Sequence, residues 1–137
     1  MHREVFEHND AWQSAAIAII GRDLFTRQAL ERLLRAAGME AHVFESTRDF
    51  LGCGRVEQTD CLILHTTLPG MDCPELREGL RGMKTAVPII VITSPAAVGQ
   101  PQNLSQHGIV ACLASPVEWE TLREAISSAL QRGGKAG

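Results

Sequence analysis

The segment Ala15–Gly38 reads AAIAIIGRDLFTRQALERLLRAAG, and it decides the fold class. Its first six residues form an uninterrupted apolar run, which is typical of a strand buried on both faces of a sheet. From Leu24 onward the apolar residues recur at steps of three and four, which predicts an amphipathic helix. Gly38 suits the left-handed turn with which helices often end. The segment therefore predicts a strand followed directly by a helix.

The rest of the chain repeats this alternation. Further strands are predicted at 41–45, 61–64, 89–92 and 109–114, and further helices at 46–51, 76–83 and 118–130. Leu68–Met71 is predicted to be a turn because it contains Pro and Gly, and 94–107 to be a loop with a weak helix. The pattern favours an α/β fold with a doubly wound five-stranded parallel sheet, (βα)5. We expect an arm at 1–14, one domain at 15–131 and a flexible tail at 132–137.

Composition and charge narrow the function classes. A chain of 137 residues that is 45% hydrophobic and 21% charged suits one folded domain and excludes a disordered or fibrous chain. Its net charge of −3 argues against direct binding to nucleic acid or to anionic membranes. The N-terminus has no apolar signal region, and a spanning helix would need about 18 apolar residues. We expect a cytoplasmic protein, not inserted in a membrane, with reduced cysteines.

Five stretches of the chain resemble the receiver domain of two-component response regulators, over about Ala15–Leu130. They are Ala29–Gly38 (ALERLLRAAG), Val43–Leu51 (VFESTRDFL), Asp60–Leu76 (DCLILHTTLPGMDCPEL), Val87–Thr93 (VPIIVIT) and Leu113–Ile126 (LASPVEWETLREAI). These stretches look most similar to those in receivers of the nitrogen-fixation, oxygen-responsive regulator group. The resemblance implies the flavodoxin-like receiver fold, with a crevice beyond the carboxyl ends of the strands.

The resemblance also implies a chemistry that needs five groups. In the family, two acids after the first strand and an aspartate after the third hold Mg²⁺, and that aspartate accepts a phosphoryl group. A Ser or Thr after the fourth strand and a Lys after the fifth contact the product. Mg²⁺ prefers hard oxygen ligands, and phosphoryl transfer is catalysed mostly by positioning and by neutralisation of charge.

Four of the five matching positions carry other residue types here. The acid pair falls on Gly21 and Arg22, the acceptor position on His65, and the lysine position on Ser115. Only Thr93 keeps the family's residue type. We therefore predict a degenerate phosphorylation crevice, a pseudo-receiver that binds no Mg²⁺ and is not an enzyme.

Residues next to the matched positions are candidates to replace the missing groups. Asp23 lies one position late and is expected to cap the first helix. Asp72 is expected to be solvated in the turn after the third strand. Arg22 places a fixed positive charge where the cation would sit, and we hypothesise that it holds the loops closed without metal. His65 is read as a neutral imidazole hydrogen-bonded in the crevice; a phosphohistidine carrier is the alternative.

The four cysteines offer a separate hypothesis. Cys61 and Cys112 fall in strands and are expected to be core residues, with Cys112 at the family's aromatic switch position. Cys53 and Cys73 are placed in loops. The chain is similar to the small receiver-like inhibitors of the oxygen-sensing nitrogen-fixation kinase, some of which bind an iron–sulfur cluster through cysteines. Geometry opposes a single-chain cluster, because the third strand, about 17 Å long at 3.4 Å per residue, separates Cys53 and Cys61 from Cys73.

The leading function hypothesis is a phosphorylation-independent pseudo-receiver that binds and inhibits a sensor histidine kinase or binds another two-component protein. The docking surfaces of the family correspond here to Leu24, Phe25, Gln28, Pro116, Val117 and Trp119. Two alternatives stay open: a redox or iron–sulfur sensing regulator, and the N-terminal regulatory domain of a transcription factor. A homodimer is a further candidate assembly.

Overall fold

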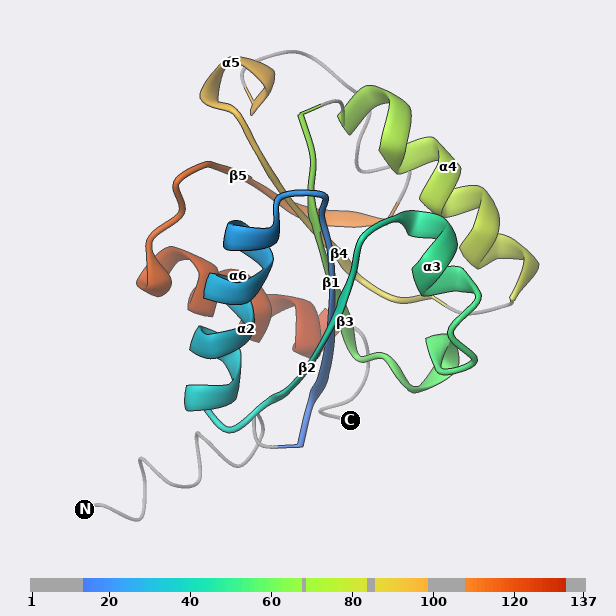
Figure 1. The fold of residues 1–137 in the computed structure, drawn as a ribbon, viewed down its shortest axis with the longest axis horizontal. Coiled ribbons are helices and arrows are strands. Elements are labelled where there is room, and N and C mark those ends of the chain that lie inside the picture. The colour runs from blue at the N-terminus through green and yellow to red at the C-terminus, as the bar shows by residue number, and fades with distance from the viewer. Residues whose placement is uncertain (1–13, 68, 84–85, 99–107, 133–137) are drawn as a thin grey trace.

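The computed structural model describes residues 14–67, 69–83, 86–98 and 108–132, and strands alternate with helices along them (Figure 1). The strands are β1 (Ala16–Ile20), β2 (Glu40–Phe44), β3 (Cys61–His65), β4 (Ile89–Thr93) and β5 (Ile109–Ala114). The helices are α2 (Leu24–Ala36), α3 (Thr47–Leu51), α4 (Pro69–Gly82), α5 (Pro95–Val98) and α6 (Trp119–Arg132), with a 3₁₀ turn η1 (Val56–Gln58).

The strands form one parallel five-stranded sheet in the order β2-β1-β3-β4-β5. The chain leaves β1 toward the β2 edge and then returns across β1 to β3, so the strand order reverses between β1 and β3. In open α/β sheets, binding sites lie beyond the carboxyl ends of the strands at such a reversal. The predicted doubly wound fold is confirmed.

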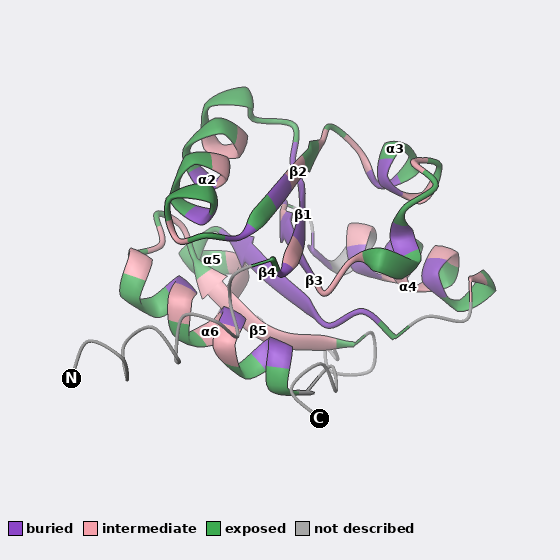
Figure 2. Ribbon diagram, turned by 90° about the horizontal axis from the view of Figure 1, so that it is seen from below, coloured by how far each residue is buried: buried purple, intermediate pink, exposed green. Residues whose placement is uncertain are grey.

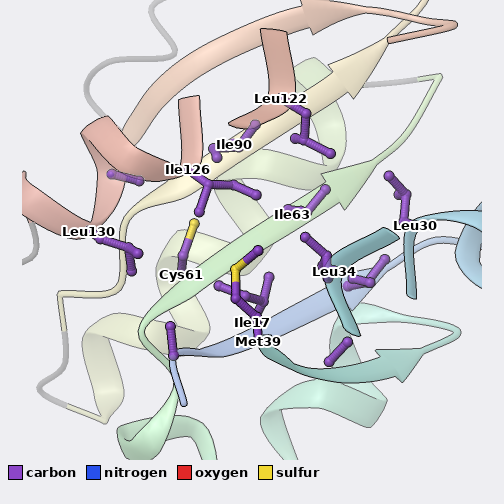
Figure 3. Packing of buried hydrophobic residues seen from close by; sticks show 14 of the residues in the cluster. Ile17, Leu30, Leu34, Met39, Cys61, Ile63, Ile90, Leu122, Ile126 and Leu130 are labelled. Atoms are coloured by element: carbon purple, nitrogen blue, oxygen red, sulfur yellow. The ribbon is translucent and has the colours of Figure 1, made fainter. Parts of the chain in front are cut away.

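Helices cover both faces of the sheet (Figure 1). On one face α2 and α6 enclose a core that includes Ile17, Leu34, Ile63 and Ile126, shown in Figure 3. On the other face α3 and α4 cover a second core, in which Phe50 is fully buried. Figure 2 shows β1, β3 and β4 buried almost throughout, whereas the outer faces of the helices are exposed.

Local signals in the sequence explain several element ends. Gly38 has φ 92°, so the residue that ends the α2 turn needs the left-handed conformation that glycine adopts without strain. Ser46 caps α3, its hydroxyl accepting a hydrogen bond from the Asp49 N–H at 3.1 Å. Both features were predicted from the sequence and are confirmed.

The free edge of β2 is partly covered by an arginine of α2. The guanidinium of Arg35 donates a hydrogen bond to the carbonyl oxygen of Ala41 at 3.1 Å and lies 2.9 Å from Glu31 Oε2. The Ala41 carbonyl points away from β1, and its hydrogen bond is therefore made outside the sheet.

One predicted turn is wrong. Leu68–Met71 was expected to be a turn, but α4 already begins at Pro69. Proline fits the first helical position because it needs no N–H partner there and its fixed φ matches the helix. As a result, Asp72 and Cys73 lie inside α4. The predicted arm (1–14) and tail (132–137) lie outside the described residues, apart from Ser14 and from Arg132, which is the last residue of α6.

No helix in the described ranges combines the length and the apolar character that crossing a lipid bilayer requires.

The packing of α3 against α4 depends on Gly79. A Cβ built at Gly79 would overlap Leu51 Cδ1 and would lie 3.1 Å from Leu51 Cδ2. A Cβ built at Gly82, at the end of the same helix, meets nothing within 4 Å. The two glycines therefore form a matched pair.

We predict that Gly79→Ala is about 1 kcal/mol less favourable than Gly82→Ala, because both gain helix propensity but only at position 79 must the Leu51 side chain change rotamer. Gly82→Ala should leave the stability unchanged or raise it, since alanine favours the helix. Urea unfolding followed by circular dichroism measures both. Equal stability of the two variants would contradict the proposed packing constraint.

Candidate functional site

A cavity of about 500 Å³ lies beyond the carboxyl ends of β1, β2 and β3. It is lined by Ile20, Gly21, Arg22, Asp23, Glu45, Ser46, Thr47, Arg48, Leu64, His65, Thr66, Thr67, Asp72 and Glu75. Four of the predicted crevice residues, Gly21, Arg22, Asp23 and His65, are thus brought together. These four residues therefore share one hollow at the reversal of strand order.

Thr93 and Ser115 do not line this cavity. Thr93 is only 1% exposed, and its hydroxyl has no hydrogen-bond partner among the described residues. Its carbonyl oxygen accepts a hydrogen bond from the Ser115 N–H at 2.7 Å, which ties the end of β4 to the residue after β5. The peptide bond between Ser115 and Pro116 is cis. Thr93 and Ser115 are therefore hydrogen-bonded to each other and do not line the cavity.

Asp23 caps α2, as predicted. Its carboxylate accepts hydrogen bonds from the Thr26 hydroxyl at 2.6 Å and from the Phe25 N–H at 3.2 Å. The Thr26 hydroxyl is the main reason why the pKa of Asp23 is lowered, with the Phe25 N–H and the nearby His65 adding to it. The carboxylate is therefore ionised and engaged in capping the N-terminus of α2.

Asp72 is not solvated as we expected. It lies in the first turn of α4, is half-buried, and accepts a hydrogen bond from the Thr66 hydroxyl. The prediction failed because the segment is a helix rather than a turn, so the carboxylate faces back toward the residue that follows β3. This bond ties the start of α4 to the end of the strand.

The side chains of Arg22 and His65 do not make the interactions that the sequence analysis expects. Arg22 is exposed and forms no hydrogen bond or ion pair within the described ranges, so the hypothesis that it holds the loops closed has no support. His65 is half-buried, and its ring likewise has no hydrogen bond to another described residue. Both side chains nevertheless line the cavity.

Sequence reasoning missed Arg27. This residue is half-buried on α2, and its Nε is buried without a partner among the described residues. Its Cγ would lie 3.7 Å from a Cβ at Gly21, so it packs against the end of β1, although it is not among the residues that line the cavity. The signal was available: Arg27 precedes buried Leu30 and Leu34 by three and seven residues, which puts it on the core-facing side of the helix.

The residues of the crevice do not fit the Mg²⁺ that the resemblance implies. Mg²⁺ needs several oxygen ligands in near-octahedral array. The matching positions offer no side chain at Gly21, a cation at Arg22 and an imidazole at His65, while Asp23 and Asp72 are held by hydroxyl donors. Within the described part of the chain, no group of three or more His, Cys, Asp or Glu is placed to hold a metal ion.

The four thiols do not converge either. Cys61 is buried in the core under α2 and α6, whereas Cys73 is buried in the core on the opposite face of the sheet, with Cys53 and Cys112 packed against it. Cys73 lies inside α4 and not in a loop as predicted. Burial raises the pKa of Cys61 and of Cys73 to about 12, and it raises the pKa of Cys112. This arrangement does not fit a cluster held by a single chain.

Comparison with known proteins shows the family of this chain. The model of the response regulator receiver domain matches residues 17–127. This chain belongs to the response regulator receiver domain family. Members of this family act in two-component signalling, and the domain is a signalling module.

Individual relatives of this receiver domain agree with the match. Nodulation protein W of Bradyrhizobium diazoefficiens is 28% identical over 93% of this chain and 56% of the relative. The transcriptional regulatory protein FixJ of the same organism is 27% identical over 85% of this chain and 57% of the relative. The chain thus spans a little over half the length of these curated relatives.

Solved structures give the same fold. The structure of the response regulator StyR is 31% identical and superposes with a TM-score of 0.77, over 90% of this chain and 62% of that one. This receiver domain therefore has the same fold as that response regulator.

We predict that Asp23→Ala lowers the melting temperature at pH 7 through loss of the helix cap, while Asp23→Asn keeps a capping side chain and costs less. The pKa of Asp23 is lowered on folding, so its ionised form stabilises the folded state. That contribution is complete above the ordinary carboxyl pKa of about 3.9 and is lost as the pH falls through the lower folded-state pKa. Thermal melts from pH 7 to pH 2 should therefore show wild type and Asp23→Asn converging in acid. A constant gap between them would contradict this role.

We also predict the order of thiol modification in the native protein at pH 8. Cys61 and Cys73 should resist iodoacetamide, because both are fully buried and their pKa is near 12. Cys53, which is half-buried after α3, should react first. Mass spectrometry of tryptic peptides reads out each site, and the urea-unfolded protein, in which all four thiols react, is the control. Rapid native labelling of Cys61 would show that the core described here is wrong.

Proposed function

We propose that this receiver domain is a phosphorylation-independent docking module that binds a sensor histidine kinase and inhibits it. The observation that carries the proposal is the residue set of the crevice: glycine, arginine and imidazole where the family places three carboxylates. Such a crevice supplies neither the metal cage nor the acceptor carboxylate, while the surrounding fold is kept. A domain of this kind occupies the kinase without taking its phosphoryl group.

The docking surface is the exposed side of α2. Phe25 is 79% exposed, Leu24 50% and Leu33 41%. Phe25, Leu33 and two exposed alanines, Ala29 and Ala36, follow one another at steps of four, four and three residues, so they share one face of the helix. We call these four residues the α2 stripe. A large exposed aromatic residue on such a stripe is the kind of side chain that anchors interfaces.

The second predicted docking segment contributes less. Pro116 is exposed, but Val117 and Trp119 are half-buried and pack against the core under α2 and α6. Burial against its own domain leaves Trp119 little surface for a partner. In this proposal the α2 stripe is therefore the principal contact, and Gln28 and Pro116, which are also exposed, are secondary.

Charge favours a different protein over a second copy of this chain. Arg32 is exposed beside the α2 stripe and has no ion pair with another described residue. A two-fold pairing of α2 with α2 about an axis near Arg32 would bring its two copies together, which costs free energy. A helical partner with an apolar ridge and acidic flanks has no such conflict. The dimerisation helices of a sensor kinase are the partner that we propose.

A second candidate function is suggested by the length of the relatives. Nodulation protein W and FixJ are each nearly twice as long as the segment they share with this chain, and FixJ is named a transcriptional regulatory protein. The domain would then be the regulatory part of a transcription factor. The same α2 stripe would in that case contact an attached domain, and the reading frame that contains this sequence distinguishes the two candidates.

We predict that the purified domain binds the cytoplasmic dimerisation and catalytic region of its cognate kinase equally well with and without acetyl phosphate and Mg²⁺, since the crevice offers nothing to phosphorylate. Binding should lower kinase autophosphorylation. Phe25→Ala should weaken binding about tenfold or more, measured by biolayer interferometry. Val43→Ala is the matched control, because Val43 is 37% exposed on β2 and lies off the α2 stripe. Binding that depends on acetyl phosphate, or no binding at all, would refute the proposal.

A further inference from the structure

A second hollow lies along β2, the outer strand of the sheet, which runs between α2 and α3 in Figure 1. We call it the β2 hollow; it is lined by residues of α2, β1 and β2 and of the segment 53–59 between α3 and β3. Its volume of about 340 Å³ is in the lower part of the range for pockets that hold small molecules. None of the described residues lines both this hollow and the crevice. The two hollows are therefore separate.

The floor of the β2 hollow is apolar. Ala16, Ala18 and Phe44 line it, and because side chains alternate along a strand, all three stand on the same face of the sheet. The two alanines are short and leave room above β1. The Phe44 ring is half-buried and meets Phe50 edge to face, with 5.4 Å between the ring centroids. A flat apolar molecule can therefore lie on this floor and against the ring.

The rim of the β2 hollow carries a net positive charge. It has two arginines and one glutamate, Arg35, Arg55 and Glu31, in a chain whose net charge is −3. The Arg35 guanidinium lies 2.9 Å from Glu31 Oε2, so its charge is balanced. Arg55 is exposed and has no ion pair with another described residue. The crevice, by contrast, is lined by two arginines and four carboxylates. An anionic ligand is therefore favoured in the β2 hollow and disfavoured in the crevice.

The outer edge of β2 adds backbone donors to this rim. The hydrogen bonds between β2 and β1 are made by alternate residues, such as Glu40, whose N–H donates to the Ala15 carbonyl oxygen at 2.9 Å. The N–H groups of Ala41 and Val43 therefore point outward, and both residues line the hollow. An incoming strand would also need the Ala41 carbonyl oxygen, which Arg35 occupies, whereas a carboxylate needs donors only. A small acid therefore suits this edge better than a peptide strand does.

We propose that the β2 hollow binds a small organic acid with a flat apolar body. The body lies on Ala16 and Ala18 beside Phe44, and the carboxylate accepts hydrogen bonds from the Arg55 guanidinium, with the outward N–H groups of β2 as further donors. The apolar floor and the cationic rim thus bind opposite ends of one molecule. The inference goes beyond kinase docking and does not rest on it, because no residue of the α2 stripe lines the hollow.

A heteronuclear NMR titration tests the ligand class, with 2-naphthoate as the probe and 2-naphthamide, which has the same rings without the charge, as the control ligand. At millimolar concentration 2-naphthoate should give saturable shifts at the amides of β2 and of 55–59, and 2-naphthamide should bind at least about threefold more weakly. Arg55→Gln should weaken 2-naphthoate binding by a similar factor. Arg81→Gln is the matched control, because Arg81 is an exposed arginine of α4 that does not line the hollow. No saturable shift, equal binding of the two ligands, equal binding by Arg55→Gln and wild type, or shifts confined to the crevice would overturn the proposal.

Cys53 gives an independent readout of where the ligand lies. It lines the hollow, and its sulfur accepts a hydrogen bond from the Arg55 N–H at 3.3 Å, so a ligand at Arg55 lies beside it. Saturating 2-naphthoate should slow iodoacetamide labelling of Cys53 and leave that of Cys112, which does not line the hollow, unchanged. Ala16→Val, which narrows the floor, should reduce this protection, and Arg55→Gln replaces it if its melting temperature falls. Unchanged labelling of Cys53, or equal slowing of both thiols, would overturn the proposal. Neither measurement involves the kinase, so failure here is distinct from failure of the proposed function.

Discussion

The pairing of β1 with β3 at the centre of the sheet is the constraint on which the rest of the structure depends. Their register joins Ile17 to Cys61 and Ile20 to Leu64, and both strands are covered by helices on each face. Because successive side chains of each strand enter opposite cores, a shift of one residue would exchange the two cores. The same register places Gly21 beside His65, so the geometry of the crevice is a direct result of how the centre of the sheet packs.

The scaffold and the crevice of this receiver domain depend on different residues. The fold needs apolar strands, the Asp23 cap and the packing of α3 on α4 at Gly79. Gly21, Arg22 and His65 line the cavity and belong to neither of the two hydrophobic cores. The residue types at these three positions can therefore vary while both cores stay intact.

Much of the fold could be predicted from the sequence because its signals are local and strong. The apolar run before Gly21, the cap at Ser46 and the left-handed turn at Gly38 each follow from one or two residues. The start of α4 could not be predicted in the same way, because Pro and Gly at 69–70 suit both a turn and a first helical turn. Only tertiary contact, with the Thr66 hydroxyl bound to Asp72, favours the helix.

The candidate site was predicted in part. The identities at positions 21, 22 and 65 and the cap at Asp23 were visible in the sequence. That the side chains of Arg22 and His65 find no hydrogen-bond partner among the described residues was not visible, because it depends on rotamers and on packing. The spacing of Arg27 from Leu30 and Leu34 places it on the core-facing side of α2, but its contact with Gly21 depends on how closely the helix packs on the end of β1, which no residue pattern encodes. The room that a crevice offers depends on how the elements around it pack in three dimensions.

The hydrogen bond from Arg35 to the Ala41 carbonyl has a consequence for the outer border of the sheet. A foreign strand that added itself alongside β2 would need that carbonyl as an acceptor, and it would first have to displace a guanidinium also anchored by Glu31. Exposed sheet borders invite such additions, and a charged side chain laid across them is a common deterrent. The Arg35 side chain of α2 thus protects the edge strand β2 from pairing with strands of other molecules.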